Sequence, residues 1–177
     1  EVLVDLTRSL IAAGFQRIVL LKGHGGNVTP GKQALSLLSH EFDAPQSPNI
    51  ALATYWELAG KAFAGAPPME SPALSHSCEY ETSLMLHLFP ERVRMEAAER
   101  AERPASNGYI PWEDDEPSRG VSMTKKTEFI SSNGSSGEPL KGTAAKGEHL
   151  FRAAVEATVE FIASFKQWPL MEDLRSE

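Results

Sequence analysis

The sequence has little cysteine, little clustered positive charge and no long apolar run, and each scarcity excludes a class of protein. Among its 177 residues Cys78 is the only cysteine, so no disulfide can form within the chain and the cytoplasm is the expected compartment. The net charge is −7 and no basic run is longer than Lys125-Lys126, which argues against a nucleic-acid partner. No apolar run approaches the roughly 18 residues of a membrane span, so we expect no membrane partner. No signal peptide is recognisable.

The spacing of apolar residues predicts alternating helices and strands. Helices are expected at residues 2–13, 32–42, 79–88 and 150–165, and strands at residues 17–21, 50–55 and about 126–130. A helix–strand–loop–helix–strand order is typical of an α/β fold with a parallel sheet. We expect a single α/β domain over residues 1–168, with an exposed acidic loop at 97–120 and a polar tail at 169–177.

The chain begins inside a helical pattern. Leu3, Leu6 and Leu10 recur at helical spacing directly after Glu1, and no initiator methionine precedes them. Because a domain rarely begins in the middle of an element, we interpret the chain as the C-terminal two-thirds of a longer protein.

The most informative segment follows the first expected strand and reads Gly23-His24-Gly25-Gly26-Asn27. Glycine lacks the Cβ that would keep a ligand away from the backbone, and ligands bind at the carboxyl ends of strands in open α/β sheets. We therefore predict that Gly25, Gly26 and Asn27 bind substrate, with backbone N–H groups as oxyanion donors; for Asn27 the alternative is a residue that caps or braces the loop. His24 is a candidate metal ligand, although a loop histidine with no ligand is the alternative.

A second segment reads His76-Ser77-Cys78-Glu79-Tyr80-Glu81 and leads into the helix expected at residues 79–88. Imidazole and carboxylate are the ligands of Zn²⁺, Mn²⁺ or Fe²⁺ at catalytic centres, and a hydrolytic site also needs a group that moves protons. A metal ligand role for Glu79 competes with that of a carboxylate favoured by a helix N-terminus. His76 and Glu81 have structural alternatives too, and Cys78 is expected to be a small filler.

These two segments, followed by Gly-x-x-Gly-x-Pro at residues 134–139 and Thr-Ala-x-x-Gly at residues 143–147, resemble the creatininase (creatinine amidohydrolase) family. The resemblance runs from about residue 1 to residue 165. It implies a three-layer α/β/α sandwich with a mostly parallel sheet, of which the N-terminal strands are missing here. It also implies a metal-dependent amidohydrolase, often a hexamer, that acts on a small-molecule amide.

The resemblance also implies roles for four residues. His24 and Glu79 would bind the metal, His76 would be the catalytic proton donor, and Glu81 would be a catalytic carboxylate that faces the substrate or supports the groups that bind the metal. The metal is expected to be zinc, with manganese or iron as alternatives, as one or two ions. The family's upstream ligands, a Glu-x-His and a following Asp, have no counterpart in residues 1–23, so this fragment alone is expected to be inactive.

Departures from the family pattern narrow the predicted substrate. Gly26 stands where true creatinine hydrolases carry a ligating Glu, Glu79 stands where they carry an apolar residue, and Lys22 replaces a usual Asn. The predicted function is therefore cleavage of a C–N bond in a small linear or cyclic amide other than creatinine, by metal-activated water. The alternative is a catalytically silent homologue that serves as a binding or assembly subunit. A phosphate-binding α/β module is a third reading, and the Gly-rich loop lacks the Gly-Lys-Ser/Thr ending it would need.

Overall fold

The computed structural model describes residues 1–42, 47–61, 63, 65–105, 107–109, 121, 123–124 and 126–172. The chain divides into two compact units: the first comprises Glu1–Gly60 with Ala154–Glu177, and the second comprises Lys61–Ala153. The expectation that residues 1–168 form one domain stays a prediction.

The first unit contains the helix–strand–helix–strand order that the sequence predicts. Its elements are α1 (Val2–Ala12), β1 (Arg17–Lys22), the 3₁₀ turn η1 (Gly25–Asn27), α2 (Val28–Leu38), β2 (Asn49–Thr54) and the short α3 (Tyr55–Leu58). Strands β1 and β2 are parallel, in a register that runs from Arg17 opposite Asn49 to Lys22 opposite Thr54. The prediction of an α/β fold with parallel strands is confirmed.

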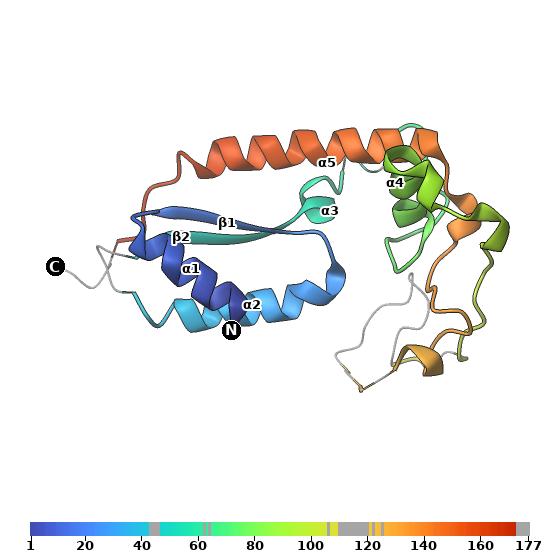
Figure 1. Cartoon of the computed structure of the whole chain (residues 1–177), viewed down its shortest axis with the longest axis horizontal. Coiled ribbons are helices and arrows are strands. Elements are labelled where there is room, and N and C mark those ends of the chain that lie inside the picture. Colours follow the sequence, from blue (N-terminus) through green and yellow to red (C-terminus); the bar gives the residue numbers. More distant parts are fainter. Residues whose placement is uncertain are drawn as a thin grey trace. The chain divides into compact units, whose positions relative to one another are not determined.

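Helices cover both faces of the β1–β2 sheet in this unit. Figure 1 shows α1 and α2 on one face and the C-terminal half of α5 (Ala144–Phe165) on the other. The core between α1, α2 and β2 is apolar, as the periodicity of the sequence requires; it is formed by Val4, Ala34 and Leu38, with Leu3, Phe42 and Ile50 against them. A Cβ added at Gly31 would lie 2.8 Å from the Leu52 side chain, so α2 reaches β2 this closely because residue 31 is glycine.

The chain that follows α5 is fixed to the start of both strands. The Arg17 guanidinium donates a hydrogen bond to the Trp168 carbonyl at 2.8 Å, and the Asn49 side-chain amide donates to the Pro169 carbonyl at 2.8 Å. Phe161, Phe165 and Trp168 form an aromatic cluster beside these bonds. Of the predicted polar tail at 169–177, residues 173–177 lie outside the described residues.

The second unit contains α4 (Glu79–Leu88), the N-terminal part of α5, and loops with short 3₁₀ turns, namely η3 (Pro90–Arg92), η4 (Met95–Ala97), η5 (Thr127–Phe129) and η6 (Pro139–Lys141). The strand predicted at about 126–130 is wrong. The Ile130 and Ser131 N–H groups donate to the Thr127 carbonyl, so the backbone satisfies itself locally, and the described residues offer it no partner strand. Within the predicted acidic loop at 97–120, residues 106 and 110–120 lie outside the described residues.

Two helices begin earlier than the apolar pattern indicates. Helix α2 starts at Val28 rather than residue 32, because the turn η1 leads directly into it and Pro30 is tolerated in the first turn. Helix α5 starts at Ala144 rather than residue 150, because the Thr143 hydroxyl accepts a hydrogen bond from the Lys146 N–H at 3.2 Å. Apolar periodicity reports the buried stripe of a helix, whereas capping residues set its first turn.

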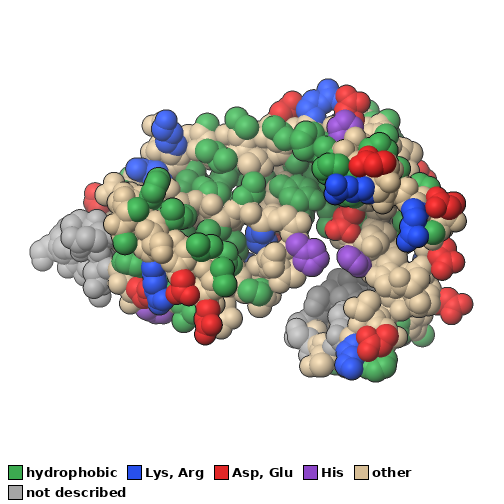
Figure 2. Space-filling model, viewed as in Figure 1, with side chains coloured by type: hydrophobic (Ala, Val, Ile, Leu, Met, Phe, Trp, Pro, Cys, Tyr) green, Lys and Arg blue, Asp and Glu red, His purple; other side chains and the backbone are tan. Residues whose placement is uncertain are grey.

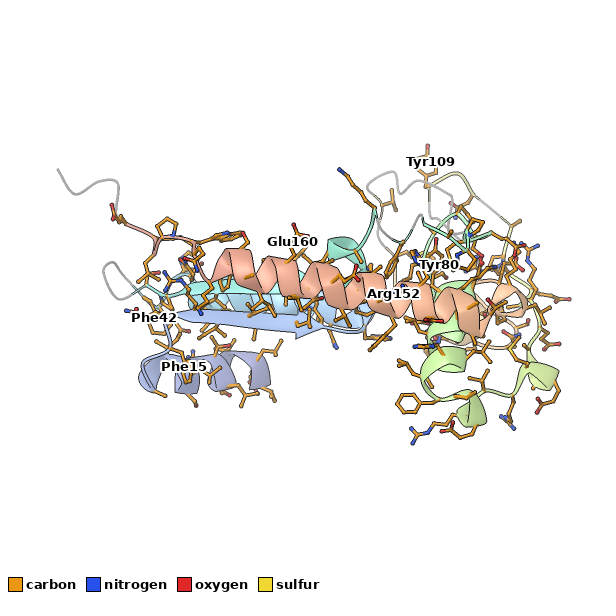
Figure 3. The ribbon with its side chains drawn as sticks, turned by 90° about the horizontal axis from the view of Figure 1, so that it is seen from above. Phe15, Phe42, Tyr80, Tyr109, Arg152 and Glu160 are labelled. Atoms are coloured by element: carbon orange, nitrogen blue, oxygen red, sulfur yellow. The ribbon has the colours of Figure 1, made fainter. Side chains whose placement is uncertain are left out.

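Large apolar side chains are exposed on helices α1 and α5 of the first unit. They comprise Val2, Leu6 and Leu10 on α1, and Val155, Val159 and Ile162 on α5. Figure 2 shows hydrophobic side chains on the face that this view presents. Figure 3 shows Glu160, a charged and exposed position of the same helix α5. Within the described part of the chain, no helix combines the length and apolar character that crossing a bilayer requires.

Candidate active site

The Gly-rich loop leaves the carboxyl end of β1 and turns directly into α2. His24 is extended (φ −145°, ψ 135°) and caps η1, since its Nδ1 accepts a hydrogen bond from the Gly26 N–H at 3.1 Å. With Nδ1 accepting, the neutral ring carries its proton on Nε2. A metal ion could bind Nδ1 only by displacing the Gly26 N–H. It could bind Nε2 only after the proton moved from Nε2 to Nδ1, which would then no longer accept from Gly26. Metal binding at His24 would therefore open this cap.

The backbone of the loop is partly used by His24 itself. The Gly26 N–H donates to the His24 ring, and the Asn27 N–H donates to the His24 carbonyl at 3.1 Å. Asn27 occupies the N-cap position of α2, yet its side chain makes no capping hydrogen bond. In this conformation the predicted substrate contacts fall to Gly25 and to the Asn27 side chain.

Lys22 ends β1 immediately before the loop. Its side chain is buried, and its ammonium nitrogen has no hydrogen-bond partner among the described residues. The Trp56 ring lies beneath it, with 5.5 Å between the Lys22 Nζ and the ring centroid. The Lys22 side chain therefore points into the fold, whereas lysine side chains ordinarily reach into solvent.

In the second unit, His76 and Glu81 form a pair at the start of α4. The His76 Nδ1 lies 3.8 Å from the Glu81 Oε2, which also accepts a hydrogen bond from the Ser77 N–H at 2.6 Å. Ser77 has a left-handed backbone (φ 50°), a conformation uncommon for a side-chain-bearing residue. The His76 ring is 61% exposed, so its Nε2 can meet a ligand while its Nδ1 faces the carboxylate.

Serine hydroxyls hold this turn in place from a distant part of the chain. The Ser136 Oγ accepts a hydrogen bond from the His76 N–H at 3.0 Å, and the Ser136 N–H donates to the His76 carbonyl at 2.9 Å. Ser75 hydrogen-bonds to both the carbonyl and the hydroxyl of Ser136. The backbone that carries the His76 ring is thus hydrogen-bonded through both its N–H and its carbonyl.

Glu79 is fully buried, and both of its carboxylate oxygens are engaged. Its Oε1 lies 2.6 Å from the Lys146 Nζ and 3.0 Å from the Glu70 N–H, while its Oε2 accepts from the Ser71 N–H at 2.6 Å. Tyr80, labelled in Figure 3, donates its hydroxyl to the Ser71 carbonyl at 3.3 Å from the next position of α4. Glu79 therefore anchors the 70–71 loop and α5 to the first turn of α4.

The surroundings of Glu79 favour its ionised form. Burial alone would raise the pKa of this carboxyl, but the hydrogen bonds from Lys146, Glu70 and Ser71 outweigh it, so the pKa lies below the ordinary value. Burial likewise opposes the charge of Lys146, and its bonds to Glu70 and Glu79 raise the pKa above the usual lysine value. The two groups form a charged pair.

Cys78 is buried beside this cluster and behaves as the small filler the sequence predicts. Burial raises the pKa of its thiol, and a Cβ added at Gly137 would lie 2.3 Å from the Cys78 Cβ. A thiol without access to solvent and with a raised pKa is a poor nucleophile.

The structure brings together His76 with Glu81, and Glu79 with Lys146. His24 belongs to the first unit and the other predicted site residues to the second, so the convergence of His24 with Glu79 stays a prediction. No group of three or more His, Cys, Asp or Glu side chains placed to hold a metal occurs among the described residues. Of the predicted ligands, His24 offers an accessible imidazole, whereas Glu79 is already fully bonded.

Two residues of these clusters were not found from the sequence. Lys146 is 67 residues from Glu79, and Ser136 is 60 residues from His76, so no local spacing connects them. The chemistry of Glu79 could have indicated such a partner, since a carboxylate on the inner face of a helix needs a buried cation.

Comparisons with known proteins show the family of the chain. The family model described as Creatininase: Creatinine amidohydrolase matches residues 1–162. The mycofactocin precursor peptide peptidase of Mycobacterium tuberculosis is 30% identical over 169 residues, which cover 94% of this chain and 55% of that protein. The chain thus spans about half the length of the curated relatives it matches.

Solved structures show the same fold. A Bacteroides fragilis protein assigned to the creatinine amidohydrolases has a TM-score of 0.74 at 28% identity, covering 97% of this chain and 62% of that one. A mutant creatininase of the Zn–Zn type has a TM-score of 0.66 at 21% identity and covers 91% of this chain and 60% of its own. Creatininase with Mn has a TM-score of 0.62 at 21% identity and covers 91% of this chain and 61% of its own. Since the family model covers nearly the whole sequence and includes both site loops, this chain belongs to the creatininase (creatinine amidohydrolase) family.

Proposed function

We propose that the complete protein is a metal-dependent amidohydrolase that cleaves a C–N bond of an amide substrate. The observation that carries this proposal is the His76–Glu81 pair, an exposed imidazole whose Nδ1 faces a carboxylate on a backbone turn fixed by Ser136. Such a pair suits a general acid, because a carboxylate facing Nδ1 can orient the ring once the 3.8 Å between Nδ1 and the Glu81 Oε2 shortens to a hydrogen bond, and it leaves Nε2 to the substrate. Membership of a family of amidohydrolases supports the same reaction class.

The proposed metal is a divalent ion, with zinc expected and manganese or iron as alternatives, because creatininases of the same fold contain zinc or manganese. His24 would hold it, and further donors would come from outside the described residues, since a catalytic metal takes at least three protein ligands. Glu79 would be a second ligand if its carboxylate exchanged its bond to Lys146 for one to the metal. When bound, the metal would polarise the amide carbonyl and activate water.

Residues of this chain would donate the proton and position the amide. His76 would give a proton from Nε2 to the departing nitrogen, while the Glu81 carboxylate faces its Nδ1. The Gly25 N–H and the Asn27 side chain would position the amide oxygen. Lys146 would keep Glu79 ionised and the first turn of α4 in place, which fixes the positions of both His76 and Glu81.

More than one class of amide is a candidate substrate. The sequence predicts a small linear or cyclic amide other than creatinine, whereas the Mycobacterium tuberculosis relative is a peptide peptidase, so peptides belong among the candidates. A homo-oligomer, hexameric by family resemblance, and a cytoplasmic location are further proposals.

The test is hydrolysis by the complete protein of a panel of formamides, lactams, creatinine and short peptides, with zinc or manganese added and with a chelator. We expect activity with metal that the chelator abolishes, and loss of activity in His76→Asn with an unchanged melting temperature. His40→Asn is the matched control, because His40 is an exposed histidine of the first unit. Metal binding without hydrolysis of any amide would favour the catalytically silent alternative.

A further inference from the structure

Lys22 is the unexplained charge of the first unit. Its side chain is 7% exposed, and its ammonium nitrogen has no hydrogen-bond partner among the described residues. Removing an ammonium group from water without a counter-charge is strongly unfavourable. The face of Trp56, with its centroid 5.5 Å from the Lys22 Nζ, attracts a cation but supplies no hydrogen-bond acceptor for its three N–H groups. The ammonium therefore has bonds left to make.

The position of Lys22 indicates where its partner belongs. Lys22 is the last residue of β1 and lies opposite Thr54, the last residue of β2, and Trp56 follows two residues later. This carboxyl edge of parallel strands is where α/β proteins bind ligands. The same edge carries the loop of His24 and the N-terminus of the 11-residue helix α2, whose dipole adds positive potential.

We propose that Lys22 binds a carboxylate group of the substrate, with the Trp56 ring as the apolar wall beside it. The proposal rests on the amidohydrolase function for its substrate and narrows that substrate to amides that carry a carboxylate near the bond to be cleaved. Lysine suits this role because its ammonium donates up to three hydrogen bonds to anionic oxygens and accepts none.

The test compares two ligands that share one amide and differ in charge, N-acetylglycine and N-acetylglycinamide. Their binding to the complete, metal-containing protein is measured by calorimetry and by tryptophan fluorescence, and is repeated after chelation to remove any metal–carboxylate contribution. We expect tighter binding of N-acetylglycine, by about 10-fold to 100-fold, since hydrogen bonds to charged groups have this strength. Trp56→Phe should remove the fluorescence change.

Lys22→Met keeps the aliphatic stem and should abolish the preference for the charged ligand, whereas Lys22→Arg should retain part of it. Lys32→Met is the control, because Lys32 is an exposed lysine of the adjacent helix α2, and it should leave the preference intact. An unchanged preference in Lys22→Met would overturn the proposal. Acetate bound as tightly as N-acetylglycine would also overturn it, because the site would then hold any small anion.

Two further outcomes separate the explanations. If a carboxylate of the protein itself paired with Lys22, Lys22→Met would lower the melting temperature and no ligand preference would depend on Lys22, which would contradict the proposal. Under the proposal, Lys22→Met melts at the same temperature or higher, because a buried unpaired charge is removed. Lys22-dependent binding without hydrolysis of any amide would contradict the proposed function but not this inference. Hydrolysis at the same rate with and without a carboxylate on the substrate would contradict this inference but not the proposed function.

Discussion

The carboxylate of Glu79 lies 2.6 Å from the ammonium of Lys146, although 67 residues separate them in the sequence. Both side chains are buried, and the Lys146 ammonium also contacts the Glu70 carboxylate at 2.8 Å and the Lys141 carbonyl at 3.0 Å. The pair links the first turn of α4 to the first turn of α5. A residue that the motif offers as a metal ligand thus has a structural partner in the folded chain.

Breaking this pair should destabilise the protein strongly. Lys146→Met should lower the free energy of unfolding by about 3–5 kcal/mol, because it leaves the buried Glu79 carboxylate without a cation. Glu79→Gln should cost less, because Lys146 keeps its ion pair with Glu70. The double variant should lose less than the sum of the two, and denaturant unfolding of all four proteins measures that coupling. Glu148→Gln, in an exposed pair with Arg152, is the control and should cost less than about 1 kcal/mol. Additive losses in the double variant would show that the pair does not act as a unit.

The same pair predicts how stability depends on acid. The pKa of Glu79 is lower in the folded protein than its ordinary value of 4.5. The contribution of its charge to the free energy of unfolding is therefore complete above pH 4.5, and it is lost as the pH falls through the pKa of the folded state. The wild-type protein should therefore lose stability more steeply than Glu79→Gln below about pH 4.5. Denaturant midpoints measured from pH 7 downward check this difference. Parallel curves for the two proteins would mean that folding does not lower the pKa of Glu79.

The close contact of α4 with α5 gives a prediction at a glycine. A Cβ at Gly147 would lie 1.9 Å from the Ser83 carbonyl oxygen and 2.8 Å from the His87 Cβ. Gly147→Ala gains about 1 kcal/mol of helix propensity, yet it should lower stability overall, because overpacking against backbone typically costs 1–3 kcal/mol or more. Gly23→Ala, where a Cβ meets nothing within 4 Å, should be close to neutral in thermal melting. An increase in the melting temperature of Gly147→Ala would show that the two helices can separate without cost.

The sequence predicted the elements whose signals are local. The apolar run before Gly23 gave β1, and helix α4 was predicted with its observed ends, Glu79 and Leu88, because the carboxylates of its first turn and its apolar residues lie within ten positions. The predicted strand at 126–130 failed because Phe129 and Ile130 have strand propensity but find no partner strand in the part of the chain that the structure describes, and pairing is not a local property. The partners of Glu79 and His76 were missed for the same reason. Burial of Lys22 was not predicted, since lysine is ordinarily exposed.

His24→Ala should abolish turnover and lower the metal content of the complete protein while leaving its stability nearly unchanged. The imidazole is exposed and caps only the three-residue turn η1, so its loss removes one exposed hydrogen bond, worth about 1 kcal/mol. By contrast, Leu38→Ala in the core of the first unit should cost about 2–5 kcal/mol and spare the metal content of the protein that stays folded. Thermal melting and metal analysis of both variants provide the comparison. If His24→Ala kept its metal and its activity but unfolded early, the histidine would be a structural cap, and metal binding would have to be sought at other residues.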